Sequence, residues 1–526
     1  MNIKLNDNLI KKIYNKYFRI YKFNIQFEDL FSILNMINYL YIDYLTYSGL
    51  SMHDPNFHNS IKSELFQLIK IQLTNVNNNL NDNDLLMAID IIELLIFKII
   101  VPKRSYKDNL IIYVKQKNKL DLLNDKIEYL KNVYQPEQRT NEWYLFRHNV
   151  VTASNIWKAF QSEKSFNQLI LEKCKPINVD KYNYVNEQSP MHWGQKYEPV
   201  SIQYYQYKYN TLIDEFGCIP HKDFTYLAAS PDGINTKNDS SLYGRMLEIK
   251  NIFNRIINGN PKFEYWIQMQ IQMEVCDLNE CDFLETRFLE YDNEEEFLND
   301  YYVDIDSSCN FKNNIMMTKD YKYKGMIIAF IIDNKPFYLY SPFACNYDEL
   351  LLWESDILSL YKDHEFFKNI YYRLDEISCV LVLRNKHWFN CALPIIQDLW
   401  QNINETKNDK SKLENLENKC KSSNQKANKN STKKKCLINN NLFNDCYSLN
   451  NDKSIEDISN SKLDNTKVIN FEKKDILNIN KIIEINNSID KKSEETKKSE
   501  ETKDIKSNKK RKKSEDIYLS IDTNNI

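Results

Sequence analysis

The chain has 526 residues, 42% of them hydrophobic and 13% aromatic, and a formal net charge of -3. This composition predicts a globular protein with at least one sizeable core. Residues 401–526 carry more Lys and Arg than Asp and Glu, so the body of the chain is more acidic than the total. A body that binds nucleic acid through a general excess of positive charge is excluded, and any DNA contact must be local.

The cysteines and the apolar runs bear on the compartment. The eleven cysteines lack the tight spacing of a disulfide framework and no secretory signal opens the chain, which predicts a reducing, intracellular compartment. The most apolar run, Leu85 to Val101, is interrupted by Asp90, Glu93 and Lys98 and ended by Pro102. We therefore expect a buried amphipathic helix there and no association with a membrane.

Residues 1–134 are predicted to form an accessory, all-helical domain. Apolar residues recur at intervals of three and four, as on one face of a helix, and no catalytic constellation is present. The expected helices are Ile10–Tyr21, Phe27–Leu50, Ile61–Val76, Asp84–Ile100 and Leu110–Val133.

Residues 136–160 predict two helices that meet at an anion site. Asn141 is placed to cap the first helix and Thr152 or Ser154 the second, so that Arg147 ends the first and Ser154 begins the second. Free backbone N–H groups, a hydroxyl and a guanidinium would then converge on one phosphate. The alternative is a capped helical hairpin with a solvated arginine.

An acid on an apolar helix face follows. In the expected helix Met191–Tyr209, Glu198 lies on one stripe with Ile202, Tyr205 and Tyr209. A carboxylate that faces inward among apolar side chains needs a partner.

A second acid stands at the end of a strand. Short strands are expected at Thr211–His221 and Phe224–Ser230, and Pro231-Asp232-Gly233 follows them. The turn leaves the Asp232 carboxylate free to bind, although an ordinary Asp-Gly turn explains this dipeptide equally well.

The next strand, Arg245–Lys250, carries a third acid and a lysine. Alternation sends Leu247 and Ile249 to one face and Glu248 and Lys250 to the other, about 6.5 Å apart along the strand. The alternative is a surface ion pair of little consequence.

A helix that begins at Pro261 presents polar groups on one face. Tyr265, Gln268 and Gln272 fall at i, i+3 and i+7, where they could orient a water or a phosphate, or form only an amphipathic edge. The cysteines that follow lack a C-x-x-C spacing, so no iron–sulfur cluster is expected.

The rest of the body is expected to complete the sheet and cover it, up to about residue 404. The expected elements are a strand Cys281–Tyr291, a hairpin Met326–Ile332 and Pro336–Ser341 turning at Asp333–Lys335, and helices Tyr347–Phe367 and Ala392–Ile403.

Residues 405–526 change to Asn, Lys, Ser, Asp and Glu, and are predicted to be a disordered charged tail. It contains a tandem repeat, Lys491–Thr502, and a basic run, Lys509–Lys513. The basic run could be a nuclear-import signal, a non-specific DNA tether or part of a passive tail.

Three acids and a lysine within a short stretch are what two-metal phosphodiester hydrolysis requires. Carboxylates hold Mg²⁺ ions that polarise the phosphate, and a lysine orients or helps to deprotonate the attacking water. Each motif alone is weak, but their order along the chain is a strong composite.

This order resembles the PD-(D/E)XK nuclease superfamily and, within it, the lambda exonuclease or YqaJ-like viral recombinase family. The resemblance runs from Gln138 to Tyr291. The matching blocks are WYLFR at 143–147, TAS at 152–154, WGQKYE at 193–198, SPDG at 230–233, LEIK at 247–250 and YWIQMQ at 265–270.

The resemblance implies roles for individual residues. The implied metal ligands are Glu198, Asp232, Glu248 and the backbone carbonyl of Ile249. The implied catalytic residues are Glu248 and Lys250, with Tyr265 and Gln268 in support, and Arg147 and Ser154 would grip the 5′-phosphate. The implied cofactor is Mg²⁺, two ions per site, with Mn²⁺ as an alternative.

The fold implied for residues 135–404 is an α/β nuclease core, a mixed central sheet flanked by helices. The implied activity is 5′-to-3′ exonuclease digestion of linear double-stranded DNA in viral recombination or repair. Implied partners are DNA ends, a single-strand annealing protein and further copies in a ring. The implied location is the host cytoplasm at a viral factory, or the nucleus if Lys509–Lys513 is an import signal.

Three departures from the family leave ring assembly, processivity and strand preference open: a long loop Ile234–Gly244, the helical domain before the core and the residues after it. Two further hypotheses compete with the exonuclease. One is a structure-specific or nicking endonuclease of the same fold, and the other is a non-catalytic DNA-binding scaffold, which the complete acid set argues against.

Overall fold

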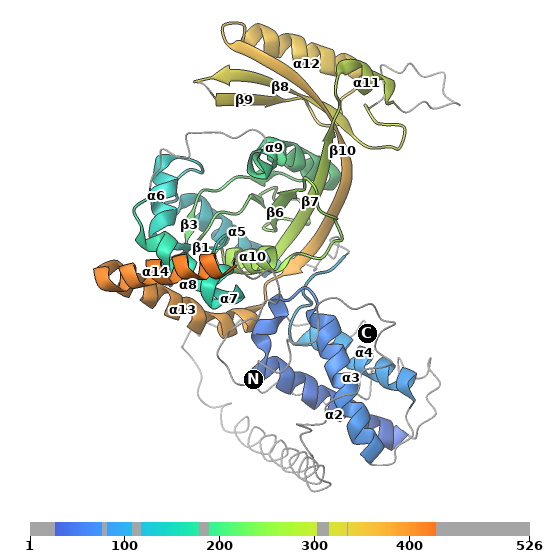
Figure 1. The fold of residues 1–526 in the computed structure, drawn as a ribbon. Helices are drawn as coiled ribbons and strands as arrows, with labels where there is room; N and C mark the ends of the chain where they lie inside the picture. Colours follow the sequence, from blue (N-terminus) through green and yellow to red (C-terminus); the bar gives the residue numbers. More distant parts are fainter. Residues whose placement is uncertain are drawn as a thin grey trace, which may run out of the picture. The chain divides into compact units, whose positions relative to one another are not determined.

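A seven-stranded sheet carries the predicted catalytic residues Glu248 and Lys250 in the computed structural model, which describes residues 27–75, 81–107, 117–177, 189–301, 315–333 and 335–427 (Figure 1). The strand order is β2-β5-β6-β7-β10-β8-β9, in which β6 and β7 are parallel and the other neighbours antiparallel. The strands are β2 Ile213–Asp214, β5 Gly233–Asn235, β6 Met246–Asn251, β7 Glu280–Glu290, β8 Lys324–Ile332, β9 Lys335–Tyr340 and β10 Glu365–Leu383.

A small second sheet lies beside the first, in the order β1-β4-β3. Its strands are β1 Val151–Thr152, β3 Ile219–Pro220 and β4 Leu227–Ala229. β1 connects α6 (Asn141–Asn149) to α7 (Lys158–Gln161) and α8 (Glu163–Cys174). β4 ends three residues before Asp232.

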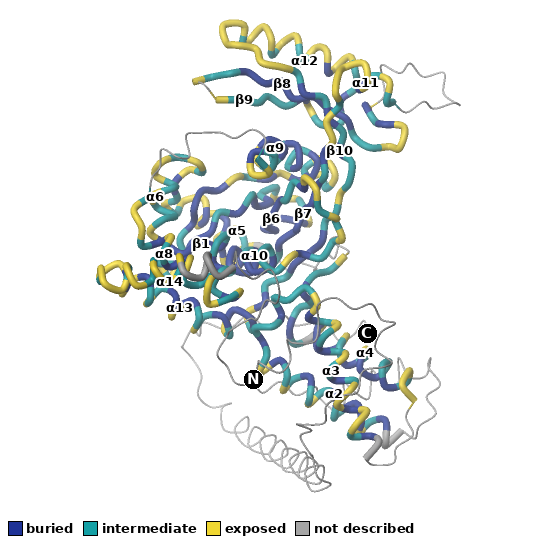
Figure 2. Tube along the Cα trace, in the orientation of Figure 1, coloured by how far each residue is buried: buried dark blue, intermediate teal, exposed yellow. Residues whose placement is uncertain are grey.

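Helices cover both faces of the central strands. The strands are largely buried, whereas α12 (Tyr347–Leu360) and α14 (Lys410–Ala427) are largely exposed (Figure 2). The parallel strands β6 and β7 are connected by α10 (Phe263–Val275), whose apolar side chains pack with Met246 and Phe283. On the other face α9 (Pro190–Tyr209) packs Tyr197 and Tyr205 against Leu247 and other apolar side chains of β6 and β7. The predicted mixed sheet flanked by helices is confirmed.

The longest strand, β10, was not predicted. The expected helix Tyr347–Phe367 ends earlier, because α12 stops at Leu360 and the chain is already extended at Glu365. The segment beyond is rich in aromatic and β-branched residues, and alternate side chains, Ile370, Tyr372 and Leu374, are buried, as expected of a strand. The predicted strand at 281–291, the hairpin that turns at Asp333 and the helix at 392–403 are confirmed as β7, β8–β9 and α13.

The N-terminal region is helical, as predicted. Its helices are α2 Phe27–Tyr47, η2 Gly49–His53, α3 Phe57–Asn75, α4 Asp82–Ile99 and α5 Lys117–Asn132. The expected helix Ile10–Tyr21 lies outside the described residues. The apolar run in α4 packs into the core, and none of the described helices combines the length and apolar character that a membrane span requires.

Arg104 attaches the N-terminal region to the start of α10. Its side chain is 2% exposed and donates hydrogen bonds to Asn260 and to the carbonyls of His53 and Pro261. The indole N–H of Trp266 in turn donates to the Arg104 carbonyl at 2.8 Å. The turn that precedes α10 is therefore fixed by a residue from outside the predicted nuclease domain.

The described helices continue into the segment that was expected to belong to the charged tail. The helix α13 spans Lys386–Asn408 and α14 spans Lys410–Ala427, although the charged tail was expected from residue 405. Residues of α14 pair with oppositely charged groups at Glu163 and Lys175, because the charges of this polar segment match those of α8 and its end. The repeat Lys491–Thr502 and the run Lys509–Lys513 lie outside the described residues.

Candidate active site

A hydrogen bond joins Asp232 to the backbone of β6, the strand that carries Glu248. Asp232 follows β4 and precedes Gly233, the first residue of β5. Its Oδ2 accepts a hydrogen bond from the backbone N–H of Ile249 at 2.7 Å. The acid at the strand end is thus fixed beside the Glu248–Lys250 stretch, with its second oxygen still available.

Glu248 and Lys250 share one face of β6, as the alternation predicts. The Lys250 ammonium donates to Glu248 Oε1, and the Gln272 side chain on α10 donates to Glu248 Oε2 at 2.7 Å. Glu248 is fully buried. Its carboxylate is therefore oriented by one charged and one neutral donor.

Glu198 reaches the same region from α9. The guanidinium of Arg139, in the segment before α6, donates to Glu198 Oε2 at 2.8 Å. Pro199 lies inside α9 directly after the acid and removes one helical N–H donor at this point.

The electrostatics connect these four groups. Burial raises the pKa of Glu198 to about 7 and that of Glu248 to about 7, and in both cases the charge of Asp232 adds to the rise. Burial alone would lower the pKa of Lys250, but Glu248 and Asp232 outweigh it and raise the pKa above its usual value. The acids therefore repel one another in a poorly solvated place, where additional positive charge would stabilise their ionised forms.

Tyr265 lies against Lys250, as predicted for a residue that supports the site. The glutamine that contacts Glu248 lies one helical turn beyond the predicted Gln268. The Lys250 nitrogen is 5.1 Å from the centre of the Tyr265 ring, and the Arg255 guanidinium carbon is 5.6 Å from it. On the same helix it is Gln272, and not Gln268, that donates to Glu248. The role of Gln268 stays a prediction.

The donor set fits a hard divalent cation, although a complete site is not assembled. Carboxylate oxygens are the ligands that Mg²⁺ and Mn²⁺ prefer, and burial together with the charge of Asp232 raises the pKa of Glu198 and of Glu248. Among the described residues, however, no three His, Cys, Asp or Glu side chains are grouped closely enough to hold an ion. The acids are instead engaged by Arg139, Lys250, Gln272 and a backbone N–H, so a metal ion would have to displace some of these donors.

Arg147 and Ser154 come together at the end of α6, as predicted. Arg147 Nη2 donates to the Ser154 hydroxyl at 2.7 Å and Nη1 donates to the Ser230 hydroxyl at 3.4 Å. The Trp143 ring lies 4.1 Å under the guanidinium, and its N–H also donates to Ser230. Ser230 was not among the predicted site residues, although its position two residues before Asp232 was a usable signal.

A buried lysine, Lys173, contacts the backbone of this Arg147 cluster. The Lys173 ammonium, on α8, donates to the backbone carbonyl of Arg147 at 2.6 Å. Burial lowers the pKa of Lys173 to about 7, and the positive charge of Arg147 adds to the fall. Two cations are thus held close together.

The predicted helix caps around this cluster are wrong. Thr140, and not Asn141, caps α6 by accepting from the N–H of Trp143. Thr152 belongs to β1 and Ser154 to the turn after it, so neither begins a helix. The backbone of Val151 and Thr152 pairs with β4 instead, in parallel register.

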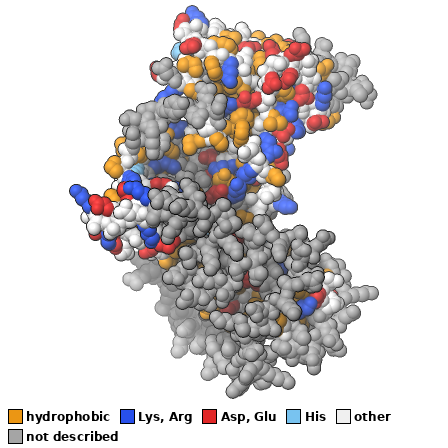
Figure 3. Space-filling model, in the orientation of Figure 1, with side chains coloured by type: hydrophobic (Ala, Val, Ile, Leu, Met, Phe, Trp, Pro, Cys, Tyr) orange, Lys and Arg blue, Asp and Glu red, His pale blue; other side chains and the backbone are white. Residues whose placement is uncertain are grey.

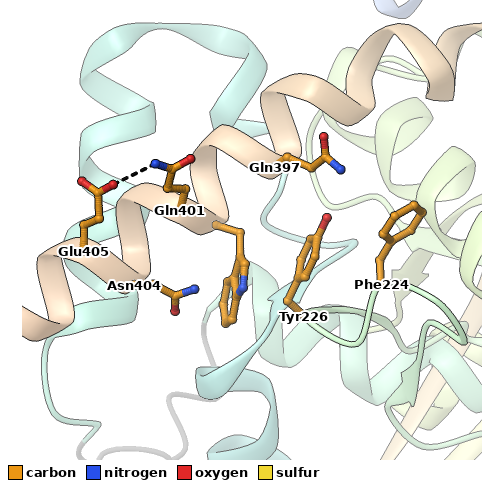
Figure 4. Close-up of a pocket in the computed structure, with 7 residues that line it drawn as sticks. Phe224, Tyr226, Gln397, Gln401, Asn404 and Glu405 are labelled. Atoms are coloured by element: carbon orange, nitrogen blue, oxygen red, sulfur yellow. Dashed lines mark hydrogen bonds between the residues drawn. The ribbon is translucent and has the colours of Figure 1, made fainter.

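An open groove of about 440 Å³ lies elsewhere, between α13 and the segment before β4 (Figure 4). The rings of Tyr226 and Trp400 stack there with centroids 5.3 Å apart, flanked by amides of α13. The residues that line it include none of the predicted site residues.

The described part of the surface in Figure 3 shows Lys and Arg side chains interspersed with Asp and Glu, and not one continuous basic face. This agrees with the composition, which requires any contact with DNA to be local.

With this fold and site, the comparison with protein families is informative. Residues 142–279 match the model of the YqaJ-like viral recombinase domain. The matched segment begins in α6, ends just before β7 and contains each predicted metal ligand and both predicted phosphate-binding residues. This part of the chain is similar to the YqaJ-like viral recombinase domain, and the resemblance seen in the sequence is confirmed.

A relative and two solved structures were also found. "Uncharacterized protein R354" of Acanthamoeba polyphaga mimivirus is 28% identical over 350 residues, which cover 60% of this chain and 59% of the relative. The chain thus spans less than two thirds of that protein. Two structures of LHK-Exo, an alkaline exonuclease from Laribacter hongkongensis, one of them with dAMP, are 18% identical and cover 55% of this chain and 99% of theirs. Their TM-score of 0.25 is too low to support a conclusion.

Proposed function

We propose that this protein is a Mg²⁺-dependent deoxyribonuclease that digests linear double-stranded DNA from its 5′ ends during viral recombination or repair. The observation that carries the proposal is the junction of Asp232 with β6. There the strand-end acid Asp232 lies close to the buried acid Glu248 and to Lys250, both on β6, and the charges of these three side chains act on one another.

The donor set supports a divalent ion. When bound by Glu198, Asp232, Glu248 and the Ile249 carbonyl, Mg²⁺ would polarise the scissile phosphate and lower the pKa of an attacking water. We expect two ions per site, as in the resembling family, and expect Mn²⁺ to replace Mg²⁺.

The residues of the chain have separate tasks in this proposal. Lys250 orients the attacking water and offsets negative charge on the transition state, while Tyr265 restricts the position of its ammonium. Gln272 keeps the Glu248 carboxylate turned toward the site. These groups are held on a sheet and a helix, which favours a fixed geometry over one that forms only on binding.

Arg147 with Ser154 and Ser230 supports recognition of a terminal phosphate. A guanidinium with two adjacent hydroxyls offers several donors to phosphate oxygens, and stacking on Trp143 fixes its plane. Ser230 lies two residues from Asp232, so a phosphate bound here would present the next phosphodiester near the acids.

The proposal is tested with one end-labelled linear duplex, prepared with and without a 5′-phosphate. We expect Mg²⁺-dependent release of nucleotides from the 5′ end, faster with the phosphate, and no release by Lys250→Ala. Equal cutting of closed circular DNA would instead favour a structure-specific or nicking endonuclease. Glu248→Ala without effect on any metal-dependent activity would favour a non-catalytic scaffold.

The proposed partners are double-stranded DNA ends and, by the resemblance, a strand-annealing protein and further copies of the chain. The mass of the purified protein in solution, with and without duplex DNA, tests the ring. Fusion of Lys509–Lys513 to a fluorescent reporter tests whether the enzyme acts in the nucleus or in the host cytoplasm.

A further inference from the structure

Arg139 differs from the other groups around the acids in that it is a half-exposed cation bound to a predicted metal ligand. Its side chain is 49% exposed, and the Glu198 side chain that it holds is 24% exposed. Nη2 lies 2.8 Å from Glu198 Oε2. The contact is therefore close but accessible to solvent.

The backbone at Arg139 is unusual. Its φ of 67° lies in the left-handed region, which is unfavourable for a residue with a Cβ. The flanking residues hold it there. The Gln138 side chain donates to the carbonyls of Phe216 and Pro231, at 2.8 and 3.4 Å, and Thr140 caps α6. The segment is thus fixed on both sides, next to the residue that precedes Asp232, and it directs Arg139 toward Glu198.

Occupation of Glu198 by a guanidinium has a consequence for the metal. The carboxylate oxygen that accepts from Arg139 is one that a divalent ion would need, and the two cations would also repel each other. Either cation, when bound to Glu198, stabilises its ionised carboxylate.

We propose that Arg139 competes with the divalent ion for Glu198, so that metal binding releases the guanidinium to a phosphate of the bound DNA. This inference rests on the proposed function, because it takes Glu198 as a ligand. A released guanidinium is a planar, bidentate donor suited to phosphate, and it starts half-exposed beside the Pro231-Asp232 turn. Arg139 thus acts as a counter-ion of Glu198 that couples binding of the divalent ion to binding of the DNA.

The first test measures Mn²⁺ binding to the full chain without DNA, by the loss of the free-ion signal in electron paramagnetic resonance. We expect Arg139→Gln to bind Mn²⁺ about threefold to fivefold more tightly than wild type, the size of effect of a partly exposed ion pair. Arg139→Lys keeps the charge and should stay near wild type. Arg373→Gln, which removes a partly exposed arginine paired with Asp300 and Asp375, controls for general loss of charge and should not change.

The second test measures DNA affinity in the Lys250→Ala background, where the duplex is not cut. With Mn²⁺ present, Arg139→Gln should weaken binding about threefold to fivefold, and without Mn²⁺ it should leave binding unchanged, because Glu198 then holds the arginine. Arg139→Gly gives a second variant in which the left-handed backbone is relaxed, so a folding defect of Arg139→Gln does not decide the outcome.

Unchanged or weaker Mn²⁺ binding by both Arg139→Gln and Arg139→Gly overturns the exchange. If wild type binds Mn²⁺ and Glu248→Gln loses it while the Arg139 variants are unchanged, the proposed function stands and only the exchange fails. If wild type binds no Mn²⁺, both fall together.

Discussion

Two buried charge clusters lie on the same sheet and have opposite electrostatics. In one, Arg245 donates to Glu280 at 2.9 Å and to Asp282 at 3.2 Å, and the Tyr205 hydroxyl donates to Asp282 at 2.6 Å. Although burial opposes it, these acids raise the pKa of Arg245 above its usual value. The charges of this cluster stabilise one another.

The candidate active site is the second cluster, where burial and mutual repulsion raise the pKa of Glu198 and of Glu248 to about 7. Its cations contact single acids and do not lie between them. The comparison shows that burial and charge alone do not mark a functional site. What marks it is a set of acids whose ionised forms the protein leaves partly uncompensated.

The largest expected effect is a loss of DNA cleavage when the candidate active-site cluster is changed. Lys250→Ala should lower the rate of DNA cleavage by about 10³-fold, because the ammonium acts on the reacting groups. Initial rates on labelled duplex, with a melting curve for each variant, check this. A variant as active as wild type would remove the lysine from the mechanism.

The counterpart is a loss of stability. Arg245→Met should lower the free energy of unfolding by about 3–5 kcal/mol, because it leaves Asp282 buried without its cation. Denaturant unfolding measures it, and Arg373→Met, at a more exposed ion pair, is the matched control. If the two variants were equally stable, the Arg245 cluster would not be structural.

A smaller effect is expected at the phosphate cluster. Arg147→Ala should reduce the preference for a 5′-phosphorylated end by about 10- to 100-fold, the range of a hydrogen bond to a charged group. The rate ratio between phosphorylated and unphosphorylated duplex reports it. Lys158→Ala, which removes a cation paired with Glu172, should keep the preference.

The smallest effect concerns Lys173, which is buried like Arg245 but lies beside a second cation. Its pKa in the folded protein, about 7, is below its value in the unfolded chain, so the unfolded chain binds more protons between pH 7 and about 10.5. Stability should therefore rise with pH in this window. Between pH 7 and 9 the Tm of Lys173→Met should therefore rise less than that of wild type, by on the order of 2 °C. A parallel pH dependence in both proteins would contradict the lowered pKa.

Local pattern made much of the site predictable. Alternation along β6 placed Glu248 and Lys250 on one face, and the turn after β4 placed Asp232 at a strand end, because both depend on backbone geometry over a few residues. Gln272 was on the expected face, but helical spacing alone did not decide between it and Gln268.

The residues that were missed depend on contacts between distant segments. Arg139 reaches Glu198 only because a left-handed residue redirects the chain, and Ser230 meets Arg147 only through the pairing of β1 with β4. β10 was missed because only a short turn separates it from α12, so its first residues, up to Phe367, were assigned to the same helix, and no element was predicted for the rest of the strand.

The pairing of β10 has an evolutionary consequence. Its residues from Tyr372 to Leu383 pair with β7, while those from Glu365 to Arg373 pair with β8, and an irregularity separates Leu374 from Glu376. Within the described strands, the β8–β9 hairpin therefore joins the sheet through β10 alone. Descendants of this gene can lengthen or exchange that hairpin as a module while Glu248 on β6, separated from it by β7 and β10, keeps its position.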